Sequence, residues 1–206
     1  MRCLQFTATP FRCDGKKLDG KIIYNFPLAL AQKQGYFEAI HFNPIWEFDE
    51  EKGDLAIARA AVNQLKQDIS TGYNHAILVR AKDKKSADNL FHKIYSPLFQ
   101  EYHPVLIHSG VSPSDRKTRM KELNSGHSRI VVCVDMFGEG IDIPNLKIAA
   151  IHEKYKSLPI TLQFIGRFAR TSKDLGTATV ITNIANDELS ESLRDLYAQI
   201  LIGMLS

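Results

Sequence analysis

The sequence has few cysteines and no long apolar run. No stretch approaches the ~18 uncharged apolar residues that could cross a membrane. Residues 1–10 also lack the charged start and apolar run of a signal peptide. Cys3, Cys13 and Cys133 show no CxxC spacing, which argues against a metal site or a disulfide framework. We therefore expect a cytoplasmic protein without a membrane span or a bound structural metal.

The composition is typical of a globular domain. Of the 206 residues, 44% are hydrophobic and 24% are charged, which excludes collagen, a coiled coil and wholesale disorder. The formal net charge of +3 is mild. It permits a nucleic-acid partner without requiring one.

From residue 75 onward, short apolar runs alternate with helical patterns. The runs are continuously apolar, which is typical of parallel strands buried on both faces, and the alternation predicts βαβ units. The sequence therefore predicts a doubly wound α/β fold with helices on both sides of the sheet. The predicted strands cover 76–79, 105–107, 130–134, 148–151 and 178–181. The predicted helices cover 87–98, a segment that begins at Pro113 after the cap residue Ser112 and ends before Gly126, and 187–201.

The first 75 residues have a less regular pattern. Trp46 and Phe48 lie in a segment predicted to be extended, where we expect them in the core, with stacking on a nucleic-acid base as the alternative. The charged residues 49–54 predict a flexible turn. The other predicted elements are a strand over 21–26, a helix over 28–34, an extended segment over 38–48 and a helix over 58–69.

Two segments beyond predicted strands have the residue types of a nucleotide site. Residues 135–144 contain two glycines and Asp142, which could accept hydrogen bonds from ribose hydroxyls. An ordinary glycine-containing strand exit is the alternative. Arg167 and Arg170 share one face of a predicted helix and could clamp phosphoryl oxygens, or could form surface salt bridges instead.

Taken in order, three segments resemble the superfamily 2 helicases and translocases. Residues 7–10 (TATP) are similar to motif III, 138–144 (GEGIDIP) to motif V, and 163–170 (QFIGRFAR) to motif VI. The HSG sequence at 108–110, followed by Arg116 and Gly126, is similar to the stretch ahead of motif V. Residues 77–82 are similar to motif IV. Residues 26–37 are similar to the DEAD/DEAH-like helicases allied to restriction-enzyme subunits. The resemblance implies a RecA-like three-layer αβα fold with a mostly parallel central sheet.

The resemblance also implies a division of the chain and a set of roles. Residues 1–20 would be a motif III remnant and linker from a first RecA-like domain, and 21–206 the second RecA-like domain. ATP and Mg²⁺ would be held mainly by the first domain of the same protein, and the further partner would be nucleic acid, DNA in preference to RNA. The implied residues are Arg167 and Arg170 for catalysis; Gly140, Asp142 and Gln163 for nucleotide; Arg80, His108, Ser109, Gly110, Asp135 and Gly138 for nucleic acid; and Thr7 and Thr9 for coupling the two sites.

Two departures and one absence limit the match. Val134 replaces the usual threonine before motif V, and Phe164 replaces an arginine that is frequent in motif VI. The chain contains no GxxxxGKS/T phosphate loop and no DExH or DEAD sequence before Thr7. We therefore expect half of an ATP-dependent helicase, inactive alone, as though the first domain had been cut away. A duplex-DNA translocase of a restriction-type system and a non-catalytic interaction module are the alternatives.

Overall fold

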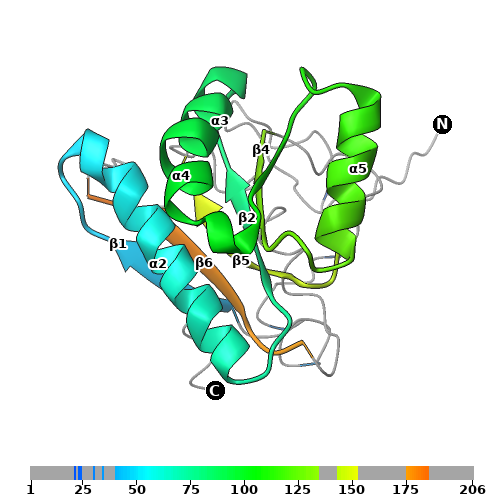
Figure 1. Cartoon of the computed structure of the whole chain (residues 1–206). Helices are drawn as coiled ribbons and strands as arrows, with labels where there is room; N and C mark the ends of the chain where they lie inside the picture. The colour runs from blue at the N-terminus through cyan, green and yellow to red at the C-terminus, as the bar shows by residue number, and fades with distance from the viewer. Residues whose placement is uncertain are drawn as a thin grey trace.

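The computed structural model describes residues 40–134, 143–152 and 175–185, together with the single residues 21, 23, 24, 30 and 34. Its centre is a six-stranded sheet of order β1-β6-β5-β2-β4-β3, in which every neighbouring pair is parallel. Figure 1 shows the helices arranged around this sheet. The strands are β1 (Ile40–Ile45), β2 (Ala76–Arg80), β3 (Val105–Ile107), β4 (Ile130–Cys133), β5 (Leu146–Ile151) and β6 (Ala178–Asn183). The helices are α2 (Glu50–Ser70), α3 (Lys84–Leu90), α4 (Ser96–Leu98) and α5 (Pro113–Asn124), with a π-helical turn at Phe91–Tyr95 and a 3-10 turn at Gln100–Tyr102.

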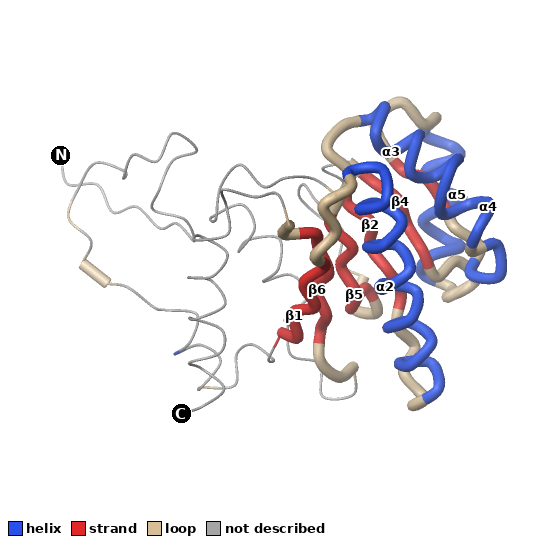
Figure 2. The backbone as a smooth tube through the Cα atoms, turned by 90° about the vertical axis from the view of Figure 1, so that its left-hand side faces the viewer, coloured by secondary structure: helices blue, strands red, loops and turns tan. Residues whose placement is uncertain are grey.

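The strands bury both of their faces, as their continuous apolar runs predict. Successive side chains of a strand point to opposite faces. Leu78 accordingly packs in the same cluster as Leu123 of α5, whereas Ile77 and Val79 pack in the cluster that contains Leu65 of α2. Helices thus cover both faces, and Figure 2 shows α2 running along the sheet. This arrangement confirms the predicted three-layer α/β fold.

The start and end of α5 follow the signals in its sequence. The Ser112 hydroxyl accepts a hydrogen bond from the Asp115 amide at 3.1 Å, and Pro113 occupies the first turn. Gly126, just beyond the helix, has a φ of +74°, a conformation that favours glycine. The prediction for this helix is therefore confirmed at both ends.

The prediction of a flexible turn over 49–54 is wrong, because most of these residues form the first turns of α2. Asp49 precedes the helix, and its carboxylate accepts a hydrogen bond from the Lys52 amide at 3.4 Å and pairs with the Lys52 ammonium at 3.0 Å. Acidic side chains stabilise the amino end of a helix. Gly53 is buried, and a Cβ there would lie 2.9 Å from Asn183 Nδ2. The glycine therefore permits close packing inside the helix.

The prediction that Trp46 and Phe48 lie in the core is also wrong. Their exposed fractions are 58% and 69%. The sheet ends at Ile45, and the backbone of Glu47 bonds to the Asn183 side chain, accepting from Nδ2 at 2.7 Å and donating to Oδ1 at 3.1 Å. Glu47 is therefore held against the fold.

Three other predictions near the ends of the chain have different outcomes. The strand predicted over 21–26 is absent at its described residues, where Ile23 and Tyr24 are 71% and 76% exposed and so bury no apolar face. The helix over 187–201 lies outside the described residues, as does most of 28–34. Within the described part of the chain, no helix is both long and apolar enough to cross a membrane.

Candidate nucleic-acid interface

The carboxyl ends of β2, β3 and β4 meet at one edge of the sheet. Arg80 at the end of β2 and Ile107 at the end of β3 both pair with Cys133 of β4, which runs between them. The backbones of Arg80 and Ile107 are therefore two strand spacings apart, which is about 10 Å. Arg80 and the loop that begins at His108 thus flank the end of β4, on the edge where α/β sheets bind ligands.

His108 is held by two hydrogen bonds, one to each ring nitrogen. The Gly110 amide donates to Nδ1 at 3.0 Å, and Nε2 lies 3.1 Å from Asp88 Oδ1 on α3. A backbone N–H can only donate, so Nδ1 is the unprotonated nitrogen and Nε2 donates its proton to Asp88. The ring is 9% exposed and is fixed in one neutral tautomer.

Gly110 is close to the His108 ring because of this hydrogen bond. A Cβ at Gly110 would lie 2.9 Å from His108 Cε1 and 3.1 Å from Nδ1, closer than side chains pack. The Gly110 N–H is also engaged within the loop. Of the three loop residues, the exposed Ser109 is therefore the one best placed to meet a ligand.

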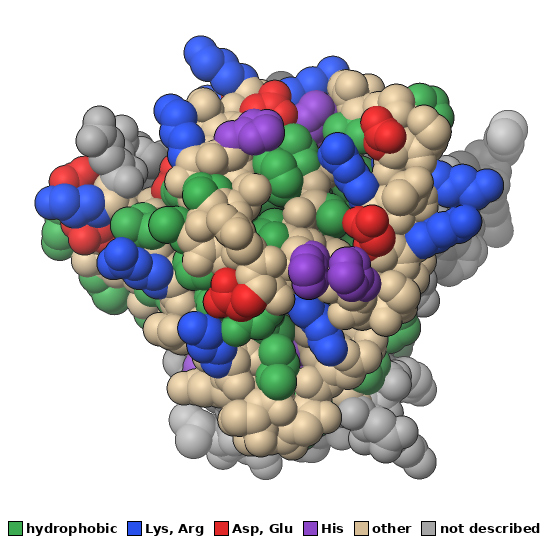
Figure 3. Space-filling model, in the orientation of Figure 1, with side chains coloured by type: hydrophobic (Ala, Val, Ile, Leu, Met, Phe, Trp, Pro, Cys, Tyr) green, Lys and Arg blue, Asp and Glu red, His purple; other side chains and the backbone are tan. Residues whose placement is uncertain are grey.

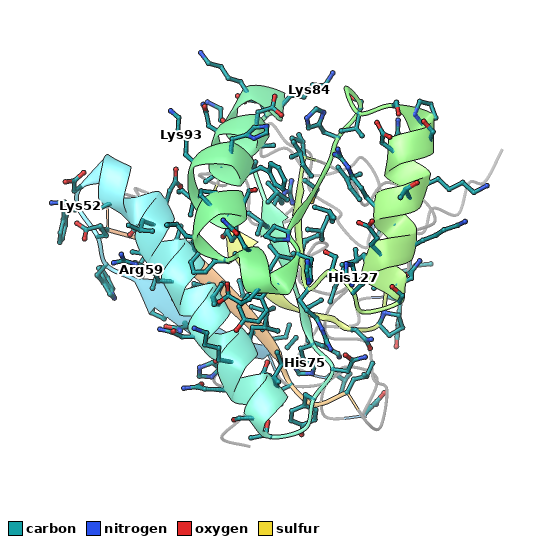
Figure 4. The ribbon with its side chains drawn as sticks, in the orientation of Figure 1. Lys52, Arg59, His75, Lys84, Lys93 and His127 are labelled. Atoms are coloured by element: carbon teal, nitrogen blue, oxygen red, sulfur yellow. The ribbon has the colours of Figure 1, made fainter. Side chains whose placement is uncertain are left out.

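Two helices begin beside this loop, and both carry basic side chains. The Asp83 carboxylate caps α3 by accepting from the Ser86 amide at 2.8 Å, and hydrogen bonds from Ser86 hold the pKa of Asp83 below its usual value. Lys and Arg side chains occur over both helices in Figure 3, and Lys84 points outward in Figure 4. Such charges can neutralise phosphates of a nucleic-acid backbone. The exposed basic residues are Lys82, Lys84, Lys85, Arg116, Lys117 and Lys121.

Arg119 differs from the other basic residues of α5. Its Nη1 donates to the Leu106 carbonyl of β3, so it ties the helix to the sheet. Arg80 is half-buried, and its carbonyl accepts a hydrogen bond from the His152 amide at 3.0 Å. These two arginines are thus partly engaged within the fold.

Most of the site residues predicted from the sequence lie outside the described residues. Of that set, Arg80, His108, Ser109 and Gly110 are placed, and the structure brings them to one edge. The others are Thr7, Thr9, Asp135, Gly138, Gly140, Asp142, Gln163, Arg167 and Arg170. In the described ranges, no three His, Cys, Asp or Glu residues are grouped as they would be around a metal ion.

At the same edge, the sequence reasoning missed a hydrogen-bonded chain of three polar residues, two of which, His152 and Tyr95, are buried. His152 follows β5 directly and its ring is 1% exposed. Its Nδ1 lies 2.7 Å from Asp54 Oδ1 in the first turns of α2, and its Nε2 lies 2.8 Å from the Tyr95 hydroxyl. Burial raises the pKa of Tyr95 well above its usual value, and the Asp54 charge raises it further. Tyr95 therefore stays protonated, and its hydroxyl can donate a hydrogen bond to Nε2.

A second buried histidine lies at the opposite edge of the sheet, where Figure 4 labels it. His75 immediately precedes β2, and its Nδ1 lies 2.7 Å from Asp68 Oδ2 near the end of α2. Its Nε2 lies 2.6 Å from the Leu175 carbonyl, and its ring stacks on Tyr73 with centroids 4.9 Å apart. No local spacing could reveal either network, because the partners are up to 100 residues apart in the chain.

The chain is similar to known helicases in sequence. The family model described as the helicase conserved C-terminal domain matches residues 60–172, which is more than half of the chain. The DEAD-box ATP-dependent RNA helicase 15 of Arabidopsis thaliana is 30% identical over 93 residues. That match covers 45% of this chain and 22% of the relative, so the chain corresponds to about a fifth of the relative's length.

Solved structures share the fold. S. cerevisiae Dbp5 bound to RNA and ADP BeF3 matches 80% of this chain and 39% of its own, with a TM-score of 0.57 and 13% identity. The Mss116p DEAD-box helicase domain 2 bound to an RNA duplex matches 77% of this chain and 59% of its own, with a TM-score of 0.54 and 19% identity. The six-stranded parallel sheet is thus a RecA-like fold, and the chain belongs to the helicase conserved C-terminal domain family.

Proposed function

We propose that this chain works as the C-terminal RecA-like domain of an ATP-dependent RNA helicase, together with an N-terminal nucleotide-binding domain. The observation that carries the proposal is the family match over 60–172, a range that includes the segments similar to motifs IV, V and VI. The names of the relatives point to RNA, and RNA therefore replaces DNA as the expected partner.

In this function, Arg167 and Arg170 act on the phosphates of ATP. Two guanidinium groups spaced three residues apart on a helix can stabilise the charge of a transferring phosphoryl group. Gly140, Asp142 and Gln163 would contact the nucleotide from the same domain. ATP and Mg²⁺ would be held mainly by the other domain, since this chain has no phosphate loop.

The RNA backbone would lie along the edge formed by Arg80 and the loop at 108–110. The exposed basic side chains at the starts of α3 and α5 support this position, because phosphate contacts supply most of the affinity for a nucleic-acid strand. With the Gly110 N–H engaged by His108, the exposed Ser109 is the expected phosphate contact in the loop. Asp135 and Gly138 would continue this surface, and Thr7 and Thr9 would couple it to ATP.

The test of this function is ATP turnover by the full-length protein. Arg167→Ala or Arg170→Ala should lower kcat by ~10³ with a smaller effect on ATP binding, as for other arginine fingers. Arg59→Ala removes an exposed arginine from α2 and should leave turnover unchanged. Turnover near the parent value in both motif VI variants would show that the assignment is wrong. Strand displacement measured beside translocation on duplex DNA separates a helicase from a restriction-type translocase.

The isolated 206-residue chain provides a second test. An arginine finger has nothing to stabilise when no phosphate is held beside it, so this chain alone should show no ATPase and no unwinding. The assay contains purified chain, ATP, Mg²⁺ and single-stranded RNA. Sustained turnover that disappears in Arg167→Ala would reveal a complete site within one chain or between copies, and would contradict the proposed division of labour.

A further inference from the structure

His75, which immediately precedes β2, meets a hydrogen-bond acceptor at each of its ring nitrogens. Nδ1 lies 2.7 Å from Asp68 Oδ2, and Nε2 lies 2.6 Å from the Leu175 carbonyl oxygen. A carbonyl oxygen and an ionised carboxylate can only accept hydrogen bonds, so both ring nitrogens have to donate. A neutral imidazole has a single N–H. The two contacts of His75 therefore require the doubly protonated ring, the imidazolium.

In the described part of the chain, two other histidines are bonded at both ring nitrogens, and neither needs a second proton. His152 meets the Asp54 carboxylate and the Tyr95 hydroxyl, so one neutral tautomer completes both hydrogen bonds. His108 likewise meets one carboxylate and one backbone amide. His75 thus differs from both of them in the number of ring protons that its partners demand.

The carboxylate beside His75 supplies a counter-charge in a place that water barely reaches. The exposed fractions of the two side chains are 2% for His75 and 13% for Asp68. Asp68 Oδ1 accepts a hydrogen bond from Gln64 Nε2 at 2.8 Å, one turn earlier in α2. Both carboxylate oxygens are therefore placed to accept, as in the ionised group. A buried charge needs such a partner, and the carboxylate stabilises the positive ring.

Two further features of this site favour a positive ring. Figure 4 shows His75 beside the end of α2, and the last turn of that helix carries no basic residue. The carboxyl end of a helix has a partial negative charge that stabilises a cation. On its flat side, the His75 ring stacks on Tyr73, with centroids 4.9 Å apart and planes 12° from parallel. The face of an aromatic ring also attracts a cation.

Two basic residues near this edge of the sheet oppose the second proton. Arg129 donates from Nη1 to the backbone carbonyl of His75 at 3.1 Å. Lys147 is buried on β5, next to the residue that pairs with Ala76. Coulomb energy falls with distance, and the Asp68 oxygen is in direct contact with the ring. The attraction of the carboxylate should therefore dominate.

We infer that His75 is a proton-dependent lock at the amino-terminal edge of the sheet. With both protons present, the ring joins Asp68 of α2 to Leu175, three residues before β6. When the ring gives up one proton, one nitrogen turns a lone pair toward an oxygen, and that contact is lost. Rising pH should thus release either the end of α2 or the start of β6 from His75.

NMR of the 206-residue chain counts the ring protons directly. Long-range ¹⁵N–¹H spectra of histidine-labelled protein at pH 7 should show two ring protons on His75. His152 should carry one proton at Nδ1, and His108 should carry one at Nε2. Contacts with Tyr73 identify the His75 signals in the parent chain, so the result does not depend on a variant that folds. A single ring proton on His75 would overturn the inference.

Urea unfolding between pH 7 and pH 9 measures the effect of the lock on stability. His75→Gln keeps a donor toward Leu175 but does not titrate. An unfolded histidine loses its proton above about pH 6.5, whereas the folded parent holds it longer, so the parent loses stability as the pH rises. Its unfolding constant should rise at least threefold relative to His75→Gln over this range. In the control, His152→Gln, the ratio to the parent should stay within twofold. Equal pH dependence of the parent and His75→Gln would contradict the lock.

Asp68→Asn tests the counter-charge separately. The asparagine oxygen can still accept from Nδ1, but the negative charge is gone. The second ring proton of His75 should therefore be absent at pH 7 in the NMR spectra of this variant. A ring that keeps both protons without the carboxylate would show that Asp68 does not hold the lock closed.

Discussion

Replacing His108 by asparagine or by glutamine separates the two hydrogen bonds of its ring. Asparagine places an oxygen near the position of Nδ1, so it can still accept from the Gly110 amide, but it no longer reaches Asp88. Glutamine places an amide nitrogen near Nε2, so it can still donate to Asp88, but it leaves the Gly110 N–H without its acceptor. We expect the loop at 108–110 to keep its shape in the first variant and to lose it in the second.

The expected loss of RNA affinity follows from the solvent exposure of the two groups that bond to the His108 ring, Gly110 and Asp88. Gly110 is exposed, so its N–H can bond to water when the ring is gone, and the net loss is about 1 kcal/mol. That free energy corresponds to about a fivefold weaker affinity for RNA. Asp88 is 49% exposed, and losing its bond should cost less. His108→Gln should thus bind RNA about fivefold more weakly, and His108→Asn within about twofold of the parent.

Fluorescence anisotropy with a labelled single-stranded RNA at several salt concentrations measures both effects. Neither His108 variant removes a charge that contacts phosphate, so the salt dependence of binding should not change. Lys84→Ala removes an exposed ammonium and should lower the slope of log K against log salt by about one unit. The reasoning is refuted if His108→Asn binds more weakly than His108→Gln, or if either variant changes the slope.

Two further predictions concern stability. Gly176→Ala should lower the free energy of unfolding in urea by about 2–4 kcal/mol, because Gly176 has a φ of +62° and a Cβ would lie 2.9 Å from the Tyr73 ring. Gly72→Ala should lower it by only about 1–2 kcal/mol, because Gly72 has a φ of +91° but a Cβ there would meet nothing within 4 Å. Equal losses would show that contact with Tyr73 is unimportant. Asp83→Ala should destabilise the chain through loss of the α3 cap. Because folding lowers the pKa of Asp83, its contribution is complete above the unfolded value of about 3.9 and is lost as the pH falls through the folded value. The difference from the parent should therefore shrink in acid, and a difference that persists at pH 2 would contradict the cap.

The elements that could be predicted from the sequence are those whose signals are local. The continuous apolar runs identified five of the six strands, because a strand buried on both faces needs apolar residues at every position. Ser112, Pro113 and Gly126 fixed the limits of α5, because a helix cap involves residues within one turn of each other. β1 was recognised only as an extended segment.

The errors arose where a distant partner decides the structure. The charged residues 49–54 indicate a turn on their own, yet Gly53 packs against Asn183, which is 130 residues further along the chain. Trp46 has the composition of a core residue but follows the last residue of an edge strand, so the sheet does not cover it. Hydrophobicity gives the preference of a residue for burial, and only the completed fold decides whether a surface is there to bury it.

The residues of the candidate site also fall into those with a local sequence signal and those fixed by distant partners. The motifs predict residues that would act on a ligand, because arginines can bind phosphoryl oxygens and glycine lets the backbone approach a ligand closely. The hydrogen bonds that anchor buried side chains follow no such local rule: Asp88 and His108 are 20 residues apart, and Asp54 and His152 are 98 apart. A buried histidine can be anchored by any nearby acceptor or hydroxyl, so many sequences satisfy the same geometry. Asp88 belongs to no motif, and its contact with His108 therefore becomes visible only in the folded chain.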